Sequence, residues 1–225
     1  MPWRGEASVS GPTLSELGFD GRAALEAVLA RSVYQSPAQA VAALTAFSHP
    51  HTVAQIPGGA LFPCVRSLGR ADRRTFALRD GRKVGLDDNA VAHAAFVWSN
   101  HWRVAGRDIQ LNHIYPRRSD PGAFTALANL CAGPSFLAKL TDHDPAIAAL
   151  LQWRVQELYG WAPAGVEPQE PAEYAGLVWA APLPATQRVE SVLRARMKSA
   201  PKHFAVRIAR EIGWAFSGFE PDPLC

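Results

Sequence analysis

The amino-acid sequence predicts an α+β fold, with a helical N-terminal region that contains a β-hairpin and a basic helical C-terminal region. Three observations predict this class: apolar residues recur at helical spacing, Asp80-Gly81 is a hairpin-turn dipeptide, and a proline-rich connector occupies 162–173. The chain has 225 residues and 48% hydrophobic content. It is therefore long enough to bury the core of one large domain or two small ones.

Local signals place the first elements. A capping box begins at Thr13, and apolar spacing then predicts a helix over 21–33. Ser36 as N-cap and Pro37 at the first helical position predict a second helix. Two short segments within 74–86 flank the Asp80-Gly81 turn and are expected to pair as strands.

Further elements are expected along the rest of the chain: a helix capped near Asp88 or Asn89, a short strand within 105–116, a short helix with Pro134 in its first turn, a longer helix from Asp144 to Gly160, a strand within 174–182 and a helical region over 185–215 that is interrupted at Pro201. These elements suggest three regions, 1–105, 106–162 and 163–225, or one compact domain that contains all of them. The connector is the expected boundary before the last region.

Composition excludes several classes of protein. No apolar run approaches the roughly 18–20 residues that span a bilayer, and the segment 1–12 lacks the basic and apolar regions of a signal peptide. We therefore expect a cytoplasmic protein with no membrane partner. Cys64, Cys131 and Cys225 are odd in number and form no C-x-x-C pair, which argues against a disulfide framework or a zinc ribbon.

Positive charge is clustered along the chain, although the net charge is only +3. Seven basic residues lie between Arg66 and Lys83, and seven more lie between Arg188 and Arg210. Clusters of this kind can form a phosphate-binding surface. They can equally be solvated faces whose charge is offset elsewhere in the fold.

The strongest candidates for catalytic residues lie in the segment 111–131. His113 follows Asn112 and precedes a loop that contains Arg117 and Arg118, and Asn129 comes sixteen residues after the histidine. A neutral histidine near its ordinary pKa can take a proton from water at physiological pH. A histidine in this role needs a second polar group that fixes its tautomer and direction.

The order of strand, histidine, loop, asparagine and helix resembles the ββα-metal motif of the HNH (His-Me finger) endonucleases. The similarity extends from Gly106 to His143, with "NHIYP" and "ANLC" as its two sequence elements. It implies a central ββα-metal finger and a metal-dependent enzyme that hydrolyses DNA phosphodiester bonds. By this resemblance, His113 would be the general base, and Asn129 would brace the finger and orient His113.

The resemblance also implies a metal site. Asn112 falls where the family often has a metal-binding Asp or His, and the helix ligands would be at Ala138 and Asp142. Alanine has no ligand atom, so His143 is the candidate to replace it. The implied ion is Mg²⁺ or Mn²⁺, which is bound through oxygen ligands and retains several waters.

DNA is the partner that the resemblance implies, and arginine forks match phosphate oxygens well. Arg117 and Arg118 would contact phosphates beside the cleaved bond. In the C-terminal region, the residues expected to contact the DNA backbone are Arg194, Arg196, Lys198 and Lys202. A role in restriction or defence follows by fold-level analogy alone, and a homodimer is left open.

Two alternatives stand beside the nuclease. The first is a nucleic-acid-binding protein with an inactive finger, which Ala138 in a ligand position favours. The second is an enzyme or scaffold unrelated to nucleic acid that uses the Trp- and His-containing segment 93–102. The 87–89 triplet could add an acidic contact to metal or could cap a helix. The pairs His49/His51 and His93/His101 are weaker zinc candidates, since no carboxylate stands at H-E-x-x-H spacing.

Overall fold

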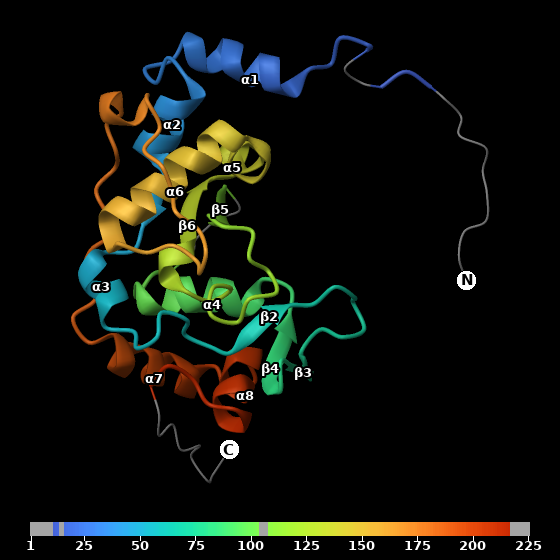
Figure 1. Ribbon diagram of the computed structural model, residues 1–225, viewed down its shortest axis with the longest axis vertical. Coiled ribbons are helices and arrows are strands. Elements are labelled where there is room, and N and C mark those ends of the chain that lie inside the picture. The colour runs from blue at the N-terminus through green and yellow to red at the C-terminus, as the bar shows by residue number, and fades with distance from the viewer. Residues whose placement is uncertain (1–10, 14–15, 104–107, 217–225) are drawn as a thin grey trace.

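The computed structural model describes residues 11–13, 16–103 and 108–216, and within these ranges the chain has the mixed α+β architecture that the sequence predicts (Figure 1). Eight α-helices and two three-stranded sheets occur in the described residues. Gly106, the first residue of the predicted finger, and Cys225 lie outside them. None of the described helices combines the length and the apolar character needed to cross a membrane.

The N-terminal helices are α1 (Gly21–Ala30) and α2 (Pro37–Leu44). Ser36 caps α2 by accepting a hydrogen bond from the Gln39 amide, as predicted. The box that begins at Thr13 closes a turn instead of starting α1, since Asp20 is the residue that caps this helix. α1 also ends three residues earlier than expected, and the Ser32 hydroxyl donates to the Leu29 carbonyl at its end.

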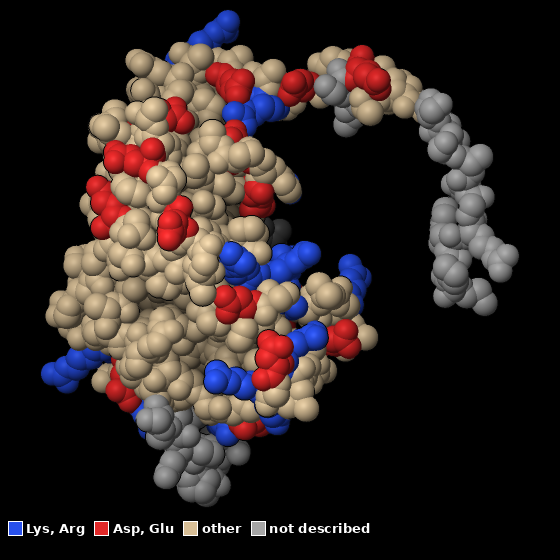
Figure 2. Space-filling model, viewed as in Figure 1, with Lys and Arg blue, Asp and Glu red and all other residues tan. Residues whose placement is uncertain are grey.

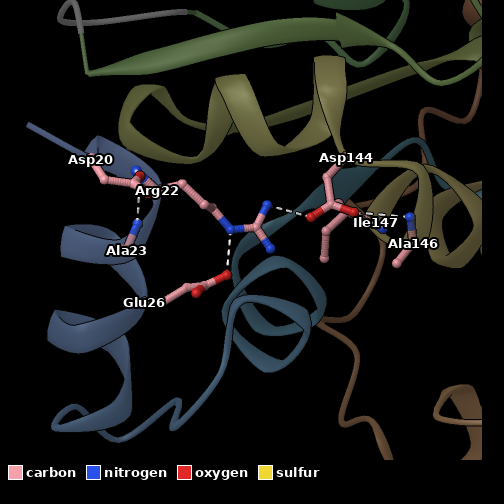
Figure 3. Close-up of polar contacts among 7 residues, drawn as sticks. All are labelled: Asp20, Arg22, Ala23, Glu26, Asp144, Ala146 and Ile147. Carbon is pink, nitrogen blue, oxygen red and sulfur yellow. Dashed lines mark hydrogen bonds and ion pairs between the residues drawn. The ribbon is translucent and has the colours of Figure 1, made fainter. Parts of the chain in front are cut away.

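Figure 3 shows how α1 is tied to the body of the molecule. The Arg22 guanidinium forms ion pairs with Glu26 on its own helix and with Asp144, the N-cap of α6 (Pro145–Tyr159). Asp144 also accepts hydrogen bonds from the Ala146 and Ile147 amides. The carboxylate therefore joins two helices that are far apart in sequence.

The first sheet has the order β1-β6-β5 and is antiparallel throughout. Its strands are β1 (Ala46–Phe47), β5 (Ile109–His113) and β6 (Leu130–Pro134). The long β5–β6 pair aligns Asn112 with Cys131 and His113 with Leu130. A loop over 114–124 and a short 3₁₀ turn connect these two strands.

Two short helical elements follow β6: a 3₁₀ turn (Ser135–Leu137) and α5 (Ala138–His143). Pro134 closes β6 and does not belong to the helix, contrary to expectation, since its extended backbone pairs with Ile109. α5 packs against β5 and against α6. α6 then runs to Gly160, which adopts the left-handed conformation expected of a helix stop.

The second sheet has the order β2-β4-β3. Its strands are β2 (Cys64–Arg66), β3 (Thr75–Arg79) and β4 (Arg82–Asp87), with β2 parallel to β4 and β3 antiparallel to it. The predicted hairpin is confirmed. Asp80 and Gly81 form its turn with φ angles of 49° and 73°, which is the reason for a glycine at this place.

The remaining helices are α3 (Pro50–Ala54), α4 (Ala90–Ser99), α7 (Val189–Ser199) and α8 (Phe204–Glu211). α4 is capped by its two preceding aspartates: Asp87 accepts from the Val91 amide and Asp88 from the Ala90 amide. α7 and α8 pack on α4 at the lower end of the molecule in Figure 1, and α5 lies in its upper half.

The strand expected within 174–182 does not form. This segment contains a 3₁₀ turn (Tyr174–Gly176) and then runs over the body, where Ala180 donates a single backbone hydrogen bond to Ala42. Pro182 has no amide hydrogen to contribute to a ladder. The chain is extended here without a strand partner among the described residues.

Two large clusters of buried apolar side chains make up the core. One includes Phe62, Phe124 and Leu193, and the other includes Phe47 and Leu150. Each cluster contains residues from all three predicted regions. The predicted region boundaries remain a prediction, but side chains from the three regions pack together.

Candidate functional site

A cavity of about 610 Å³ lies between β5 with its following loop and the helices α5 and α6. We call it the central cavity. Its polar lining includes His113, Asn112, Asp142, Arg66, Arg117 and Arg118. Figure 2 shows a hollow on the right of the molecule with Lys and Arg side chains along its lower border.

His113 is the last residue of β5, and its backbone position is fixed by its pairing with Leu130 of β6. Its Nε2 lies 2.9 Å from the Phe124 carbonyl oxygen, and its ring stacks on that of Phe124 with 5.0 Å between centroids. A carbonyl oxygen can only accept, so Nε2 carries the proton. Nδ1 is then left with the lone pair that a general base requires.

The environment of His113 favours the neutral ring. Burial lowers the pKa of His113 from its ordinary value of 6.5, and the positive charge of Arg66, or of His93 when that ring is protonated, lowers the pKa further. The hydrogen bond to Phe124 and the Asp142 carboxylate act in the opposite direction. The net direction is downward, so His113 is neutral at physiological pH and able to accept a proton.

Asn129 is fully buried and braces the loop that follows His113. Its Oδ1 accepts from the Tyr115 amide at 2.7 Å, and its Nδ2 donates to the Tyr115 and Ala123 carbonyls at 3.2 and 3.0 Å. Asn129 makes no side-chain hydrogen bond to His113 and does not line the central cavity. It acts on His113 through Ala123, whose neighbour Phe124 holds the imidazole.

A second anchor holds the far end of the same loop. The Thr125 hydroxyl donates to the Phe62 carbonyl at 2.7 Å and accepts from the Phe62 amide at 3.0 Å. The backbone of Arg118 accepts from the Arg66 amide at 2.8 Å. The loop is therefore attached to the chain leading into β2 as well as to β5 and β6.

Asn112 faces α5. It is 6% exposed, donates from Nδ2 to the Thr141 hydroxyl at 2.8 Å, and accepts at Oδ1 from Gln110 Nε2 at 3.0 Å. An amide oxygen has two lone pairs, so Oδ1 keeps one after the bond to Gln110. Neither Thr141 nor Gln110 was singled out from the sequence, since strand alternation and the α5 packing bring them here.

The polar residues of α5 differ in whether they line the central cavity. Asp142 is exposed and lines the central cavity, whereas Ala138 is 4% exposed and has no donor atom. His143 is exposed and does not line the cavity, because the next residue of a helix points about 100° away. Of the three helix positions considered from the sequence, only Asp142 reaches the cavity.

The donor set fits a weakly held Mg²⁺ and does not fit zinc. Asp142 and Asn112 offer a carboxylate and an amide oxygen, and Mg²⁺ is usually bound by one or two carboxylates together with waters and phosphate. Zinc sites need three or four nitrogen, sulfur or carboxylate ligands. No cluster of three or more His, Cys, Asp and Glu that could bind a metal occurs in the described part of the chain.

Three arginines from two segments surround this arrangement. Arg66 ends β2, and Arg117 and Arg118 lie on the loop after β5. All three are exposed, and none forms a salt bridge within the described residues. Arg66 was part of a predicted basic cluster, but its place beside His113 depends on the Arg66–Arg118 backbone contact, which has no local sequence signal.

The basic residues predicted near the C-terminus lie elsewhere. Arg194 pairs with Glu190 and lies over the Trp214 ring at 5.3 Å. Arg196 lines a separate cavity beside α7. Lys198 and Lys202 are exposed, and none of the four lines the central cavity. The fold thus brings Arg117 and Arg118 to His113 but not the α7 side chains.

The weaker candidates have structural roles. His49 caps α3 by accepting from the His51 amide at 3.1 Å. His93 lies on α4, is half-buried, and forms a hydrogen bond with the backbone of Leu111. His101 is exposed with a φ of 52°. Asn89 of the 87–89 triplet does line the central cavity, and its buried Oδ1 has no hydrogen-bond partner.

No family model matches this chain, and neither a curated protein nor a solved structure matches it.

Proposed function

We propose that the protein is a metal-dependent endonuclease of HNH type that hydrolyses DNA phosphodiester bonds. One observation carries the proposal: a neutral histidine at the end of a strand shares a cavity with a carboxylate, a buried amide and three unpaired arginines. Two antiparallel strands followed by a short helix support it, as does the bracing of the intervening loop by Asn129. A setting in restriction or defence rests on fold-level analogy alone.

The proposed chemistry begins with a water between His113 and the phosphorus. Nδ1 of His113 takes a proton from this water, whose oxygen forms the new bond to phosphorus while the bond to the leaving sugar oxygen breaks. Phe124 holds the imidazolium that results, because its carbonyl accepts from Nε2. General-base assistance of this type contributes roughly 10²–10⁴-fold to a rate.

The arginines and the α5 carboxylate complete the site. Arg66, Arg117 and Arg118 bind the phosphate oxygens and offset their charge, since none of the three forms a salt bridge within the described residues. Asp142 and Asn112 would hold Mg²⁺ or Mn²⁺ through oxygen. Such an ion supplies positive charge to the phosphate and to the leaving oxygen.

Incubation of supercoiled plasmid with the protein and Mg²⁺ or Mn²⁺ tests the proposal. Wild type is expected to nick or linearise the plasmid, and His113→Ala is expected to lose at least about a hundredfold in rate. His143→Ala is the matched control, since it removes an exposed histidine that does not line the cavity. An intact plasmid with wild type and either ion, under conditions where the protein binds DNA, contradicts the proposal.

A second function is favoured by one specific observation. Ala138 is buried where a helix ligand is expected, and it leaves Asp142 as the sole carboxylate that lines the central cavity in the described residues. An inactive finger that only binds nucleic acid is consistent with this. In that case wild type and His113→Ala shift DNA equally in a gel, and both leave the plasmid intact.

A further inference from the structure

A second cavity, of about 790 Å³, lies beside the β3–β4 hairpin, and we call it the hairpin cavity. Arg79, Arg82 and Lys83 line it together with Pro121 and Gly122. The last two residues belong to the 114–124 loop, whose earlier residues line the central cavity. A single loop therefore borders both cavities.

Arg79 and Arg82 give the hairpin cavity a net positive charge, because Asp80 is the one carboxylate among the described residues that line it. They are direct partners in the β3–β4 register, and like charges placed opposite each other destabilise a strand pair. Both are exposed, and neither forms a salt bridge in the described residues. Lys83 differs, since its ammonium lies 3.3 Å from a Glu211 carboxylate oxygen.

The pleat of β4 explains why the two arginines are available. A Cβ on Gly85 would lie 2.6 Å from Ile208, so the odd positions of this strand face α8. Arg82 and its partner Arg79 consequently point to the opposite face. That face borders the hairpin cavity, and Figure 2 shows Lys and Arg side chains interspersed with Asp and Glu over the lower right of the molecule, where this sheet lies.

The strand register also gives the separation of the two basic sites. Asp87 of β4 is aligned with Arg66, whose amide donates to the Arg118 carbonyl of the loop at the central cavity, and Arg82 comes five residues earlier in the same strand. At about 3.4 Å per residue, the backbone at Arg82 is about 17 Å from the backbone that carries the loop arginines, although the Arg66 side chain itself points to the face of the sheet opposite Arg82. Base pairs in B-DNA are about 3.4 Å apart along the axis, so this separation corresponds to about five base pairs.

We propose that the hairpin cavity is a second phosphate-binding site for the DNA duplex whose scissile phosphate lies in the central cavity. This inference rests on the proposed function. One pair of arginines, Arg79 and Arg82, lies on the hairpin, and the other, Arg117 and Arg118, lies on the braced loop. Two pairs held at a fixed separation match the phosphates of a duplex better than those of a flexible single strand. The distal grip is therefore the β3–β4 hairpin, and not the α7 residues expected from the sequence.

Salt-dependent binding of a fluorescein-labelled DNA duplex of about 20 base pairs tests the inference, measured by anisotropy without divalent metal so that no cleavage intervenes. The slope of log affinity against log salt is negative, and each lost phosphate contact lowers its magnitude by about 0.9. Arg79→Gln/Arg82→Gln is thus expected to lower this magnitude by about 2 and to weaken binding on the order of tenfold. Arg196→Gln/Lys198→Gln is the matched control and should leave the slope unchanged.

Duplex length supplies an independent check. A duplex stem of about four base pairs, closed by a linker so that its strands stay paired, cannot occupy both cavities at once. Arg79→Gln/Arg82→Gln should therefore weaken its binding less than it weakens binding of the longer duplex. An equal salt slope for this variant and wild type on the longer duplex overturns the inference. So does an effect that is present with single-stranded DNA or duplex RNA and absent with duplex DNA.

The two proposals fail in distinguishable ways. If wild type leaves plasmid intact but the hairpin variant still lowers the magnitude of the salt slope, the nuclease proposal falls and the hairpin site stands. If plasmid is cleaved and the slope does not change, the hairpin site falls alone. A thermal unfolding midpoint of the variant at or above that of wild type shows that the effect is not due to misfolding, because the substitution removes a repulsive pair.

Discussion

The Asn129 side chain holds the Tyr115 backbone through both of its peptide groups, accepting from the amide at 2.7 Å and donating to the carbonyl at 3.2 Å. These two hydrogen bonds tie the start of the loop segment between β5 and β6 to its end. Since His113 and Phe124 lie at the two ends of that loop and contact each other, the geometry of the imidazole depends on an amide that never touches it.

We expect Asn129→Asp to destabilise the fold by roughly 2–4 kcal/mol and to lower cleavage with it. A carboxylate cannot donate to the Tyr115 and Ala123 carbonyls, and its charge would be buried. Asn112→Asp is the matched control, because Gln110 already donates to its Oδ1 and the Thr141 hydroxyl can turn from the Ala138 carbonyl to donate to the new carboxylate. Urea denaturation measures both, and an equal loss for the two variants would contradict the bracing role.

Asp142 and His143 are adjacent on α5 but differ in what they face. We expect Asp142→Asn to raise the Mg²⁺ concentration for half-maximal plasmid cleavage by about tenfold or more, since it removes the carboxylate from the donor set. His143→Asn should leave this concentration within about twofold of wild type. If His143→Asn has the larger effect, the assignment of the helix ligand is wrong.

The pH dependence of cleavage should report the lowered pKa of His113. The base works in its neutral form, so the rate should stay constant as the pH falls from neutral through 6.5 and decline only at lower pH. Asp142 raises this pKa and Arg66 lowers it. Relative to wild type, Asp142→Asn should therefore move the decline to lower pH, and Arg66→Gln should move it to higher pH.

The same pKa makes the fold sensitive to acid. Unfolded His113 takes up a proton near pH 6.5, whereas the folded histidine resists protonation, so falling pH favours the unfolded chain below 6.5. His93 and His203 also have pKa values lowered by burial and add to the effect. Thermal unfolding midpoints should be flat above this pH and drop below it, and the drop should be smaller in His113→Asn.

The contact between Arg22 and Asp144 allows a test of how α1 is attached (Figure 3). Arg22 is 44% exposed, so we expect Arg22→Ala to cost at most about 1 kcal/mol. Asp144→Ala removes the ion pair and also the N-cap of α6, and should cost about 1–2 kcal/mol. Chemical denaturation compares the two, and a larger loss for Arg22→Ala would contradict this order.

Much of the fold is predictable because its signals are local. The Ser36 and Asp144 caps, the Gly160 stop and the Asp80-Gly81 turn each depend on a few neighbouring residues, and all four occur as expected. The strand expected within 174–182 fails because strand formation needs a partner ladder, which this segment lacks among the described residues. Apolar composition alone does not supply a partner.

Some residues of the candidate site could be predicted from the sequence and others could not. The resemblance to the HNH motif indicated that one loop connects His113 and Asn129, and the same resemblance singled out Asp142 on the following helix. Arg66 and Thr141 could not be placed, because their approach to the cavity depends on packing between segments distant in sequence. Charge clustering along the chain likewise gave no position in space, and the basic residues predicted on α7 do not line the central cavity.

The 114–124 loop limits which mutations the protein can accept. Asn129 anchors it to one sheet and Thr125 anchors it to the chain entering the other. Both of its ends border the central cavity, and Pro121 and Gly122 between them border the hairpin cavity. An inserted or deleted residue would alter both cavities and the distance between them in one step. Substitutions at its exposed arginines can tune affinity freely, but its length is constrained by two partners at once.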